Sequence, residues 1–396
     1  MTELKNRIQQ LSTEYFEDIR VIRRHFHRHP ELSKKEFETA AYICSCLDKY
    51  GIPYRNNIAG TGIVGLISGS GEGKNIVLRA DMDALPVNEA NDTEYKSEVP
   101  GTMHACGHDV HMSCLLGAAR ILNTLKDRFH GSVKIIFQPS EESYPGGAIG
   151  MIRNGVLKNP DTSIAIAQHV LNTIDAGKIG IRPGFYMAST DEIYLTVKGK
   201  SGHAATPEQD IDPVLIAAHI LVAIQQIVSR NASPLMPTVI SFGKIIGEGR
   251  TNIIPAEVKI EGTVRTFSET WRKEIHEKIR KIASGIAEAL GGECDVFVDP
   301  GYPAVKNDET VTRNVRAWAT EYLGEKNVID VEQRMTAEDF SYFSWEIPSC
   351  LYRLGIRNEK KGFVSNLHTP TFDVDESSLV TGMGLMAYLA VRALSE

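Results

Sequence analysis

The stretch NIVLRADMD, residues 75–83, combines an apolar run with two carboxylates at its end, a pattern typical of a strand in an α/β domain. The apolar part predicts a buried strand, and Asp81 and Asp83 follow it. In open α/β sheets, ligand sites gather at the carboxyl ends of the strands. Side chains two residues apart on an extended chain point the same way, so these carboxylates would repel each other unless cations lay nearby. Taken alone, Asp-x-Asp after a strand is more often a turn or a helix cap.

Helices and strands alternate on both sides of this stretch. Apolar runs at 63–68, 132–138 and 163–168 predict further strands, and helical patterns lie at 109–127 and 147–157. Such alternation is typical of an α/β domain. We therefore expect a mixed, mostly parallel sheet flanked by helices.

Two amphipathic helices are expected before the first strand. Apolar residues recur at steps of three and four from Leu4 to Phe26, which predicts one long helix ending near Pro30. A second helix should run from about Glu36 to Tyr50. The histidines of the RRHFHRHPELS segment lie at the end of the first helix, where we assign them a structural role.

The pattern changes at about Phe185. Strand, helix, strand, strand, helix and strand follow in turn, which is the βαββαβ order of the ferredoxin-like split unit. Strand and helical patterns resume after it. We therefore expect an inserted domain at 185–299, within a first domain made of 1–184 and 300–396.

Composition excludes several classes of function. The 396 residues carry a formal net charge of -7 with a pI near 6.0, so no basic face suggests nucleic acid and a small substrate is expected. No run of 18 apolar residues predicts a membrane span, and the mixed-charge N-terminus resembles no targeting signal. The six cysteines are scattered, which is unlike a disulfide framework. We expect a reducing, cytoplasmic setting with free thiols.

A second chemical motif is GTMHACGHDVHMSC, residues 101–114. Cys106 and His108, two residues apart, can reach one metal ion, because thiolate and imidazole are both good ligands for zinc and its neighbours. Asp109 is expected to cap the helix that begins there.

Two more histidines lie in the same motif. His111 shares a helical face with His108, so it is a candidate ligand or a support for a ligand. For His104 and His111, a hydrogen-bonded structural role near the helix start is the simpler interpretation.

Further candidates come from distant parts of the sequence. Glu141 and Glu142 follow the strand at 132–138, and adjacent carboxylates point different ways, so one can bind a metal while the other handles a proton. A solvated helix start is an equally good interpretation of that pair. His169 follows the next predicted strand, and His368 lies in NLHTPTFDVDE near the C-terminus.

Together these groups can hold two divalent ions about 3.5–4 Å apart with a bridging water. Such a site lowers the pKa of the water to roughly 7, and a carboxylate outside the ligand set can take its proton. The sequence therefore predicts metal-assisted hydrolysis of an amide. The alternatives are a thiol hydrolase with Cys106 as nucleophile and a binding protein without catalysis.

Six motifs, in order along nearly the whole chain, carry a family resemblance. They are ADMDALP, HACGHD, FQPSEE, QHV, KGKSGHAATP and LHTPTFDVDE. The chain resembles the aminoacylase/amidohydrolase family of di-metal peptidases, in the branch of hippurate hydrolase, N-acetyldiaminopimelate deacetylase and the plant auxin-conjugate hydrolases. The resemblance implies a di-zinc exopeptidase-like catalytic domain with an inserted lid and dimerisation domain.

For the first domain, the resemblance implies a role for each chemical residue. Glu141 is the general base and acid, and Asp83 orients a metal-binding histidine. Asp81 stands where other relatives carry a histidine ligand, and Cys106 replaces a bridging aspartate. The implied metal ligands are Cys106, His108, Glu142, His169 and His368.

For the inserted domain, the resemblance implies contacts with the substrate. His203 reaches across the interface of a homodimer to polarise the scissile carbonyl. Asn252 and Arg265 match positions that hold the carboxylate or carbonyl of the substrate, although a strand-end salt bridge is an equal alternative for Arg265. Glu338 and Asp339 match an AEDF motif, which either supports the site from behind or starts a capped helix.

The implied function is hydrolysis of the amide bond of an N-acyl-L-amino acid, giving a carboxylate and a free amino acid. A dipeptidase or carboxypeptidase is the alternative, because both kinds of substrate present a carboxylate-bearing amide to the same site. The ligand set favours zinc, with manganese, cobalt or nickel as alternatives. The expected partners are a small-molecule substrate and a second copy of the chain, without nucleic acid or membrane.

Overall fold

The computed structural model describes all 396 residues, which form two compact units. Unit 1 contains Met1–Gly184, Lys306–Glu332 and Asp339–Glu396, and unit 2 contains Phe185–Val305 and Gln333–Glu338. Unit 2 thus extends past the predicted boundary at residue 299 and includes a short segment from further along the chain. The short strands β7 (Gly184–Met187) and β14 (Val305–Asn307) contain two of the boundaries between the units.

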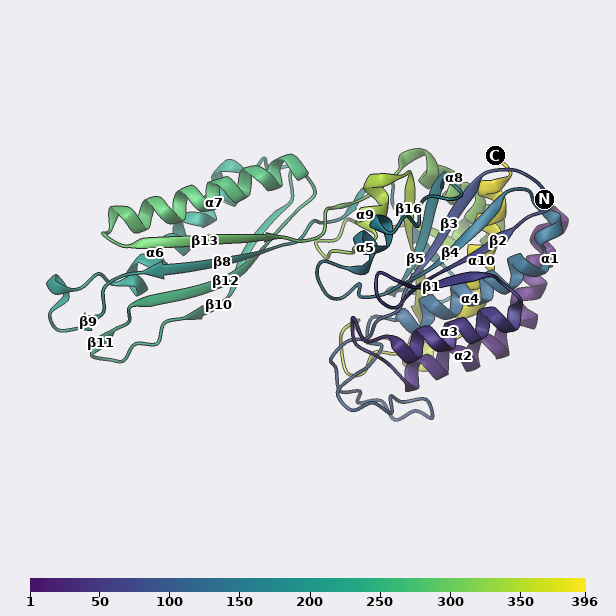
Figure 1. The fold of residues 1–396 in the computed structure, drawn as a ribbon, viewed down its shortest axis with the longest axis horizontal. Coiled ribbons are helices and arrows are strands. Elements are labelled where there is room, and N and C mark those ends of the chain that lie inside the picture. Colours follow the sequence, from purple (N-terminus) through teal and green to yellow (C-terminus); the bar gives the residue numbers. More distant parts are fainter. The chain divides into compact units, whose positions relative to one another are not determined.

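Unit 1 is built on an eight-stranded mixed sheet (Figure 1). In order across the sheet, its strands are β1 (Tyr54–Ile58), β2 (Gly62–Ser68), β4 (Ser132–Gln138), β3 (Asn75–Asp81), β5 (Ile164–Asp175), β16 (Ser349–Arg357), β6 (Ile179–Ile181) and β15 (Val328–Asp330). The four central strands, β4, β3, β5 and β16, run parallel, whereas β1 and β2 pair antiparallel beside them. The predicted fold class, a mixed and mostly parallel sheet flanked by helices, is confirmed.

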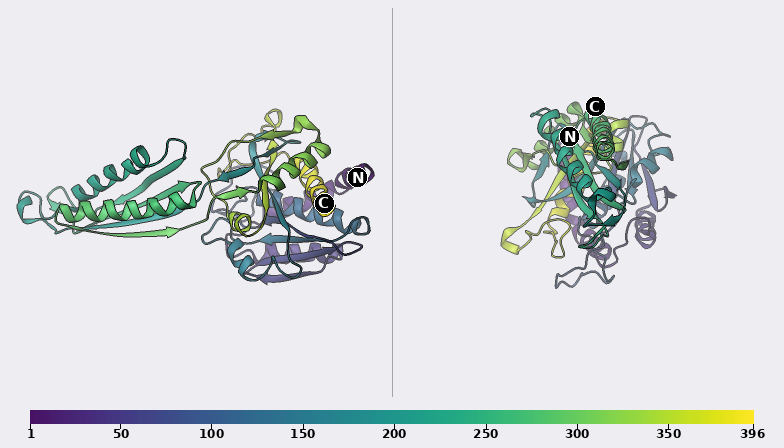
Figure 2. Two further views of the ribbon diagram at one scale, coloured as in Figure 1. Left: turned by 90° about the horizontal axis from the view of Figure 1, so that it is seen from above. Right: turned by 90° about the vertical axis from the view of Figure 1, so that its left-hand side faces the viewer.

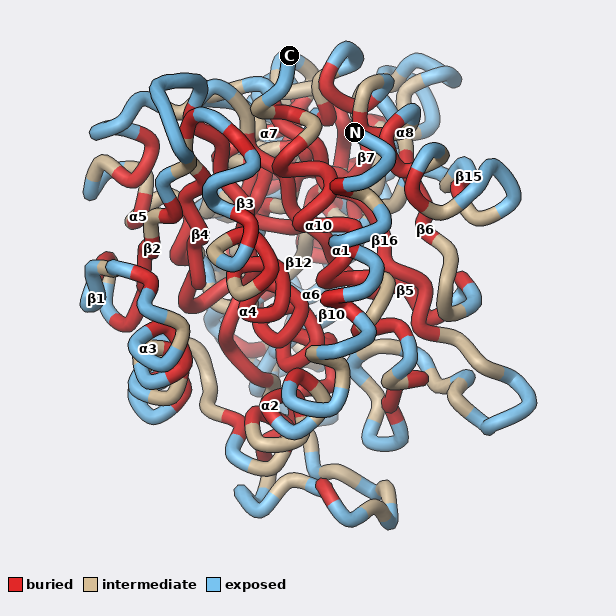
Figure 3. The backbone as a smooth tube through the Cα atoms, turned by 90° about the vertical axis from the view of Figure 1, so that its right-hand side faces the viewer, coloured by how far each residue is buried: buried red, intermediate tan, exposed pale blue.

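Helices cover the sheet of unit 1. They are α1 (Thr2–Glu14), α2 (Phe16–Arg28), α3 (Phe37–Tyr50), α4 (His108–Thr124), α5 (Gly147–Arg153), α8 (Glu309–Leu323), α9 (Ser341–Glu346) and α10 (Ser378–Leu394). α4 and α10 pack against each other and against β3, and Figure 3 shows the buried core running through them. α4 is buried along nearly its whole length because its sequence is apolar on almost every side.

One sequence-based expectation is corrected at the N-terminus. The predicted single helix from Leu4 to Phe26 is two helices, α1 and α2, which meet at Tyr15. The apolar period continues through this junction, since Leu11 and Ile19 on either side are both buried. The apolar periodicity of the sequence therefore predicted which face is buried, but it did not predict the break between the two helices at Tyr15.

Unit 2 has the ferredoxin-like order. Its elements are β8 (Asp191–Lys198), α6 (Pro213–Gln226), β10 (Thr238–Ile246), β12 (Glu257–Thr266), α7 (Glu269–Ala289) and β13 (Glu293–Pro300). The strands form an antiparallel sheet in the order β10-β12-β8-β13, and both helices lie on one face of it (Figure 2). A two-stranded ribbon of β9 (Gly202–His203) and β11 (Ile253–Ile254) completes the unit.

One apolar segment of unit 2 is an exception to the expectation that nothing could span a membrane. Pro213–Asn231 is long and apolar enough by length and composition alone, and 33% of it is buried. Ile216, Ile220 and Ile224 pack into the core of unit 2. Core helices of soluble proteins meet the same criterion.

A buried ion pair joins β8 to α7 in unit 2. The guanidinium of Arg272 donates to both oxygens of Asp191, and His276 Nε2 lies 2.7 Å from Asp191 Oδ2. Burial alone would raise the pKa of Asp191, but hydrogen bonds from His276 and Arg272 outweigh burial and lower that pKa. Asp191 therefore stays ionised to a lower pH in the folded chain than in the unfolded chain.

We predict that Asp191→Asn lowers the thermal unfolding midpoint, because breaking a buried ion pair costs about 3–5 kcal/mol. The contribution of Asp191 is present above its unfolded pKa of about 3.9 and is lost as the pH falls through its folded pKa. The difference from wild type should therefore be largest near neutral pH and shrink in strong acid, as thermal melts across pH would show. The exposed Asp295, which pairs with Lys198, provides the control variant Asp295→Asn, which should change the midpoint little because exposed ion pairs contribute little to stability. An equal effect of both variants would contradict the prediction.

Candidate active site

The candidate site lies at the carboxyl ends of the parallel strands of unit 1. Asp81 at the end of β3 pairs with Gln138 of β4, and His169 of β5 pairs with Arg353 of β16. α4 begins at the same place, since its first-turn residue His111 contacts Asp81. The topology therefore brings residues from distant parts of the sequence to one end of the sheet, where α/β proteins place their ligands.

Gly107 determines how the chain enters α4. Its φ is +81°, in the left-handed region, and a Cβ atom there would lie 2.6 Å from Cγ2 of Val170. Only glycine satisfies both the conformation and the close approach. The turn presents Cys106 and His108, on either side of the glycine, to the same group of side chains.

The structure brings together all five residues that the resemblance implies as metal ligands. Cys106 Sγ lies 3.5 Å from His169 Nε2 and 3.3 Å from His368 Nε2. Glu142 Oε1 lies 3.5 Å from His368 Nε2 and 3.9 Å from His108 Nε2. Cys106 belongs to two groups of possible ligands, one with His108 and His169 and one with Glu142 and His368. This arrangement matches two ions that share the thiolate.

Polar atoms that lack a hydrogen bond within this cluster fit divalent cations. Both ring nitrogens of His108 and Oε1 of Glu142 are buried without a hydrogen bond, although buried polar groups are nearly always paired. Burial lowers the pKa of His108, but the carboxylates of Asp81 and Asp83 outweigh burial and raise it to about 10. The cluster therefore attracts positive charge, and a divalent ion is the natural source of that charge.

The surroundings of Cys106 argue against a thiol nucleophile. Burial and the carboxylates of Glu142 and Glu141 raise the pKa of the Cys106 thiol well above its usual value. Burial also lowers the pKa of His169, the imidazole 3.5 Å away. Catalytic cysteines need the opposite, a thiol pKa lowered by a protonated neighbour. A thiolate at this position needs a metal ion to stabilise it.

His111 is a support for the site and cannot be a ligand in this conformation. Its Nε2 accepts the backbone N–H of Val170 at 2.8 Å, so the proton must be on Nδ1, which donates to Asp81 Oδ1 at 2.6 Å. The oxygen of Val170 accepts from His169 Nδ1 at 2.8 Å, which leaves Nε2 of His169 facing Cys106. His111 thus holds the backbone that fixes the tautomer of His169.

Asp83 holds the backbone of the glutamate pair. Its Oδ1 accepts the N–H of Glu141 and its Oδ2 accepts the N–H of Glu142, both at 2.9 Å. Ser33 donates to the same carboxylate at 2.6 Å, and Nδ1 of His108 lies 3.5 Å away. The position next to His108 agrees with the implied role as an orienter of a histidine. The two amide contacts are a further role that the sequence did not indicate.

Two expectations about the HACGHD motif are corrected. Asp109 does not cap α4, because the buried guanidinium of Arg23 and the ring of His27 bind its carboxylate, each at 2.8 Å. His104 is not hydrogen-bonded through its ring, and burial lowers its pKa to about 3. The sequence-based interpretation missed Arg23. The signal was its place on the apolar face of its helix, because a lone arginine there indicates a buried acidic partner.

Asp339 supports the site from behind, which is one of its two predicted roles. Its carboxylate accepts hydrogen bonds from Arg79, Gln138 and the backbone N–H of Ala148. Arg79 in turn donates to Asp81 at 2.7 Å. Sequence reasoning missed Arg79, although a charged residue inside the apolar run NIVLRA indicates a buried partner. The alternative of a helix cap fails, because α9 starts without a side-chain cap.

Unit 2 brings two of its three predicted site residues together. His203 and Ile253 pair across the β9–β11 ribbon, and the backbone carbonyl of Asn252 accepts the N–H of Ala204 at 3.1 Å. His203 Nδ1 accepts the N–H of Ala205, so the exposed Nε2 carries the proton and can donate.

Arg265 lies elsewhere in unit 2. It is near the end of β12 that pairs with Asp191, whereas the ribbon follows the opposite end, at Glu257. Eight residues of strand correspond to about 27 Å. The Arg265 side chain contacts Thr263 and forms no ion pair, so the predicted alternative of a strand-end salt bridge is not formed.

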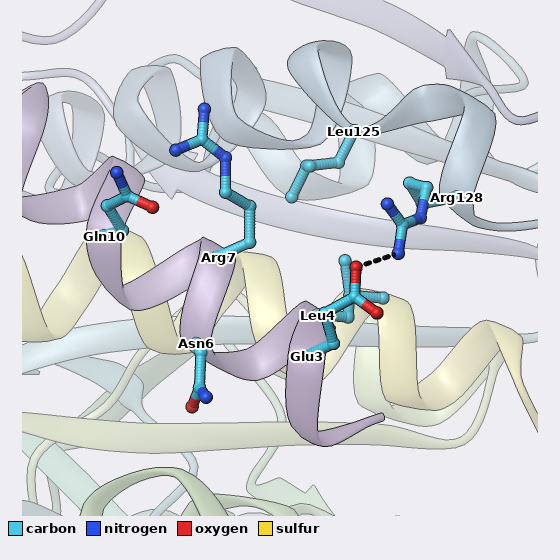
Figure 4. Close-up of a pocket in the computed structure, with 7 residues that line it drawn as sticks. All are labelled: Glu3, Leu4, Asn6, Arg7, Gln10, Leu125 and Arg128. Atoms are coloured by element: carbon cyan, nitrogen blue, oxygen red, sulfur yellow. Dashed lines mark hydrogen bonds and ion pairs between the residues drawn. The ribbon is translucent and has the colours of Figure 1, made fainter.

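A surface cavity of about 360 Å³ lies apart from these residues, between α1 and the end of α4 (Figure 4). It is lined by exposed polar side chains such as Arg7 and Gln10, and an ion pair of 2.8 Å between Glu3 and Arg128 lies at its edge. The cavity shares no residue with the candidate site, and it has no group suited to hydrolysis.

Known proteins resemble this chain over most of its length. Residues 77–392 match peptidase family M20/M25/M40. The N-acetyl-L-cysteine deacetylase of Bacillus subtilis is 38% identical over 94% of this chain and 87% of that protein. Thermostable carboxypeptidase 2 of Saccharolobus solfataricus is 38% identical over 98% of both chains. The crystal structure of the YXEP protein of Bacillus subtilis, a dinuclear metal binding peptidase, has a TM-score of 0.84 at 32% identity and covers 97% of this chain and 99% of that one.

The cluster predicts that zinc stabilises the metal-free protein. A ligand that binds only the folded state at a hundredfold excess over its Kd adds about 2.7 kcal/mol, so the thermal midpoint of chelator-treated protein should rise when zinc or manganese is added. Cys106→Ala should remove most of the rise, because both ligand groups lose a member. Cys44→Ala, at a half-buried cysteine outside the cluster, is the control and should keep it. A full rise in Cys106→Ala would show that the metal binds elsewhere.

Proposed function

Because the chain belongs to peptidase family M20/M25/M40, we propose that it is a metal-dependent hydrolase of N-acyl-L-amino acids. Membership confirms the resemblance drawn from the sequence motifs, and it makes the chain a hydrolase of the amidohydrolase and peptidase type. The observation that carries the proposal is the buried carboxylate of Glu141 beside two ligand groups that share Cys106. A site that only bound metal would have no need of this additional carboxylate.

Five residues would hold the two divalent ions. They are Cys106, His108, Glu142, His169 and His368. When bound there, the ions lower the pKa of water and polarise a carbonyl. Zinc is the favoured ion, and manganese, cobalt or nickel suit the same donors.

Glu141 and Glu142 divide the chemistry of the site. Glu142 lies within 3.9 Å of two of the histidines, which supports a role as a ligand. Glu141 would take a proton from the attacking water and give it to the nitrogen of the leaving amine. Because Asp83 holds the backbone of both glutamates, their division of roles depends on a fixed geometry.

Unit 2 would supply the groups that recognise the amide and the carboxylate. His203 Nε2 can donate to the carbonyl oxygen as negative charge develops there. Arg265 forms no ion pair in the structure, although Asp191 and Glu192 are near enough to interact with it electrostatically; its unpaired guanidinium supports a role in binding the carboxylate of the substrate. Asn252, next to His203 on the ribbon, can bind a carbonyl or carboxylate oxygen.

The separation within unit 2 supports a homodimer. His203 lies on the ribbon beyond one end of the four-stranded sheet, and Arg265 lies toward the other end of that sheet, so a single unit cannot apply both to one small amide. In a homodimer both residues can act on one substrate if His203 of each subunit reaches the active site of the other. α6 has exposed apolar side chains at Val214, Leu215 and Val222, and β10 is an edge strand. Such surfaces are typical of subunit contacts.

The substrate class is tested by assaying a panel of amides with the enzyme loaded with the same metal ion throughout. We expect N-acetyl and N-benzoyl amino acids to be hydrolysed with kcat/KM at least about tenfold above dipeptides, and Glu141→Gln to lose about 10²–10⁴ in rate while keeping its metal. The variant shows that turnover comes from this site and not from a contaminant. A preference for dipeptides would favour the alternative of a dipeptidase or carboxypeptidase. Activity that survives metal removal would overturn the proposal altogether.

The dimer is tested by mixing inactive subunits. We expect His203→Ala and Glu141→Gln to be impaired separately, by about 10²-fold or more. After they are unfolded and refolded together, activity should return, because a heterodimer contains one site with both residues intact. Refolding each variant alone is the control. If the mixture is no more active than its components, His203 does not act on the partner subunit's site.

A further inference from the structure

Ser140, the residue before the glutamate pair, has an unusual backbone conformation. Its φ is +57°, in the left-handed region, although it is not a glycine. Residues with a Cβ atom rarely adopt this region, and surrounding contacts must hold them there. Because Glu141 and Glu142 follow directly, the conformation of Ser140 sets the direction in which both side chains leave the backbone.

Glu36 supplies the contacts that hold Ser140. Oε1 of Glu36 accepts the N–H of Ser140 at 2.8 Å and its hydroxyl at 3.2 Å. The N–H of Lys34 donates to the same oxygen at 3.0 Å, and the hydroxyl of Thr61 donates to Oε2 at 2.8 Å. Glu36 is separated from Ser140 by more than a hundred residues, so these contacts form only in the folded chain.

Burying the carboxylate of Glu36 is energetically costly, and no cation compensates for it. Glu36 is completely buried, its side chain does not cap α3, and all of its hydrogen bonds come from neutral donors. A buried carboxylate without a cation is expensive. Besides Lys34 and Thr61, the contacts of Glu36 are with Ser140, directly before the glutamate pair.

Three successive backbone amides are bound by two buried carboxylates. Glu36 accepts the N–H of Ser140, and Asp83 accepts those of Glu141 and Glu142. We propose that Glu36 is a positioning residue that holds Ser140 in its left-handed conformation and so directs Glu141 and Glu142 into the metal cluster. This inference rests on the proposed function of those two glutamates.

The substitution Glu36→Gln distinguishes geometry from charge. The three contacts of Oε1 need only an oxygen, which the amide of glutamine retains, and the hydroxyl of Thr61 can turn to accept from the amide nitrogen. We expect Glu36→Gln to keep kcat within about threefold of wild type and Glu36→Ala to lose about 100-fold, since small misplacements cost that much. KM should change little, because the substrate-binding groups lie in unit 2.

A second pair of variants tests the same conformation with Glu36 intact. Ser140→Gly adopts the left-handed region freely and should keep kcat, whereas Ser140→Val strongly disfavours it and should lose kcat as Glu36→Ala does. This pair decides the question if Glu36→Ala does not fold. The proposal is overturned if folded Glu36→Ala or Ser140→Val has wild-type kcat. It is also overturned if Glu36→Gln is as impaired as Glu36→Ala, because charge would then be the cause.

The zinc-induced rise in thermal midpoint gives a readout apart from activity. Because Glu142 is a proposed ligand, Glu36→Ala and Ser140→Val should reduce the rise, while Glu36→Gln and Ser140→Gly should keep it. If wild type hydrolyses no N-acyl amino acid, the proposed function fails, yet this comparison still tests the positioning role. An equal rise in all four variants would contradict that role.

Discussion

Buried charge is the constraint on which the rest of this structure depends. The parallel strands of unit 1 end in a region where Asp81, Asp83 and Glu141 are each 6% exposed or less. Carboxylates in such a place are stable only when positive charge or hydrogen-bond donors surround them. The surrounding helices and loops can be understood as the means by which each carboxylate obtains such partners.

The carboxylates obtain partners in two different ways. Those behind the cluster are bound by the protein itself, since Arg79 contacts Asp81 and Asp339, and Arg23 contacts Asp109. Glu142 faces the cluster, and its buried Oε1 accepts no hydrogen bond. The carboxylates bound by arginine make the region rigid, whereas the unbound oxygen of Glu142 favours the binding of a cation. Rigid surroundings and unsatisfied ligand atoms together are what a preformed metal site requires.

The sequence predicted the parts of this site that depend on local pattern. Strand ends followed by acids indicated where Asp81, Asp83 and the pair Glu141 and Glu142 would meet, because parallel strands bring their carboxyl ends together. His169 was expected to follow its strand, but β5 continues past it to Asp175. The pattern could not reveal contacts formed only by folding, such as that of Arg23 with Asp109 or of Glu36 with Ser140. It also missed the break at Tyr15, because the apolar period continues through it. Local pattern indicates what is buried, but tertiary partners decide what each buried group does.

The turn at Gly107 has a consequence for how an ion would be bound. The left-handed glycine fits closely against Val170, so the chain between Cys106 and His108 is already ordered before any ion arrives. As proposed ligands, two donors from one rigid turn would act as a chelate, and the entropy of bringing them together would be lost during folding instead of during binding. Ion affinity at this centre is therefore partly a property of how well that turn folds.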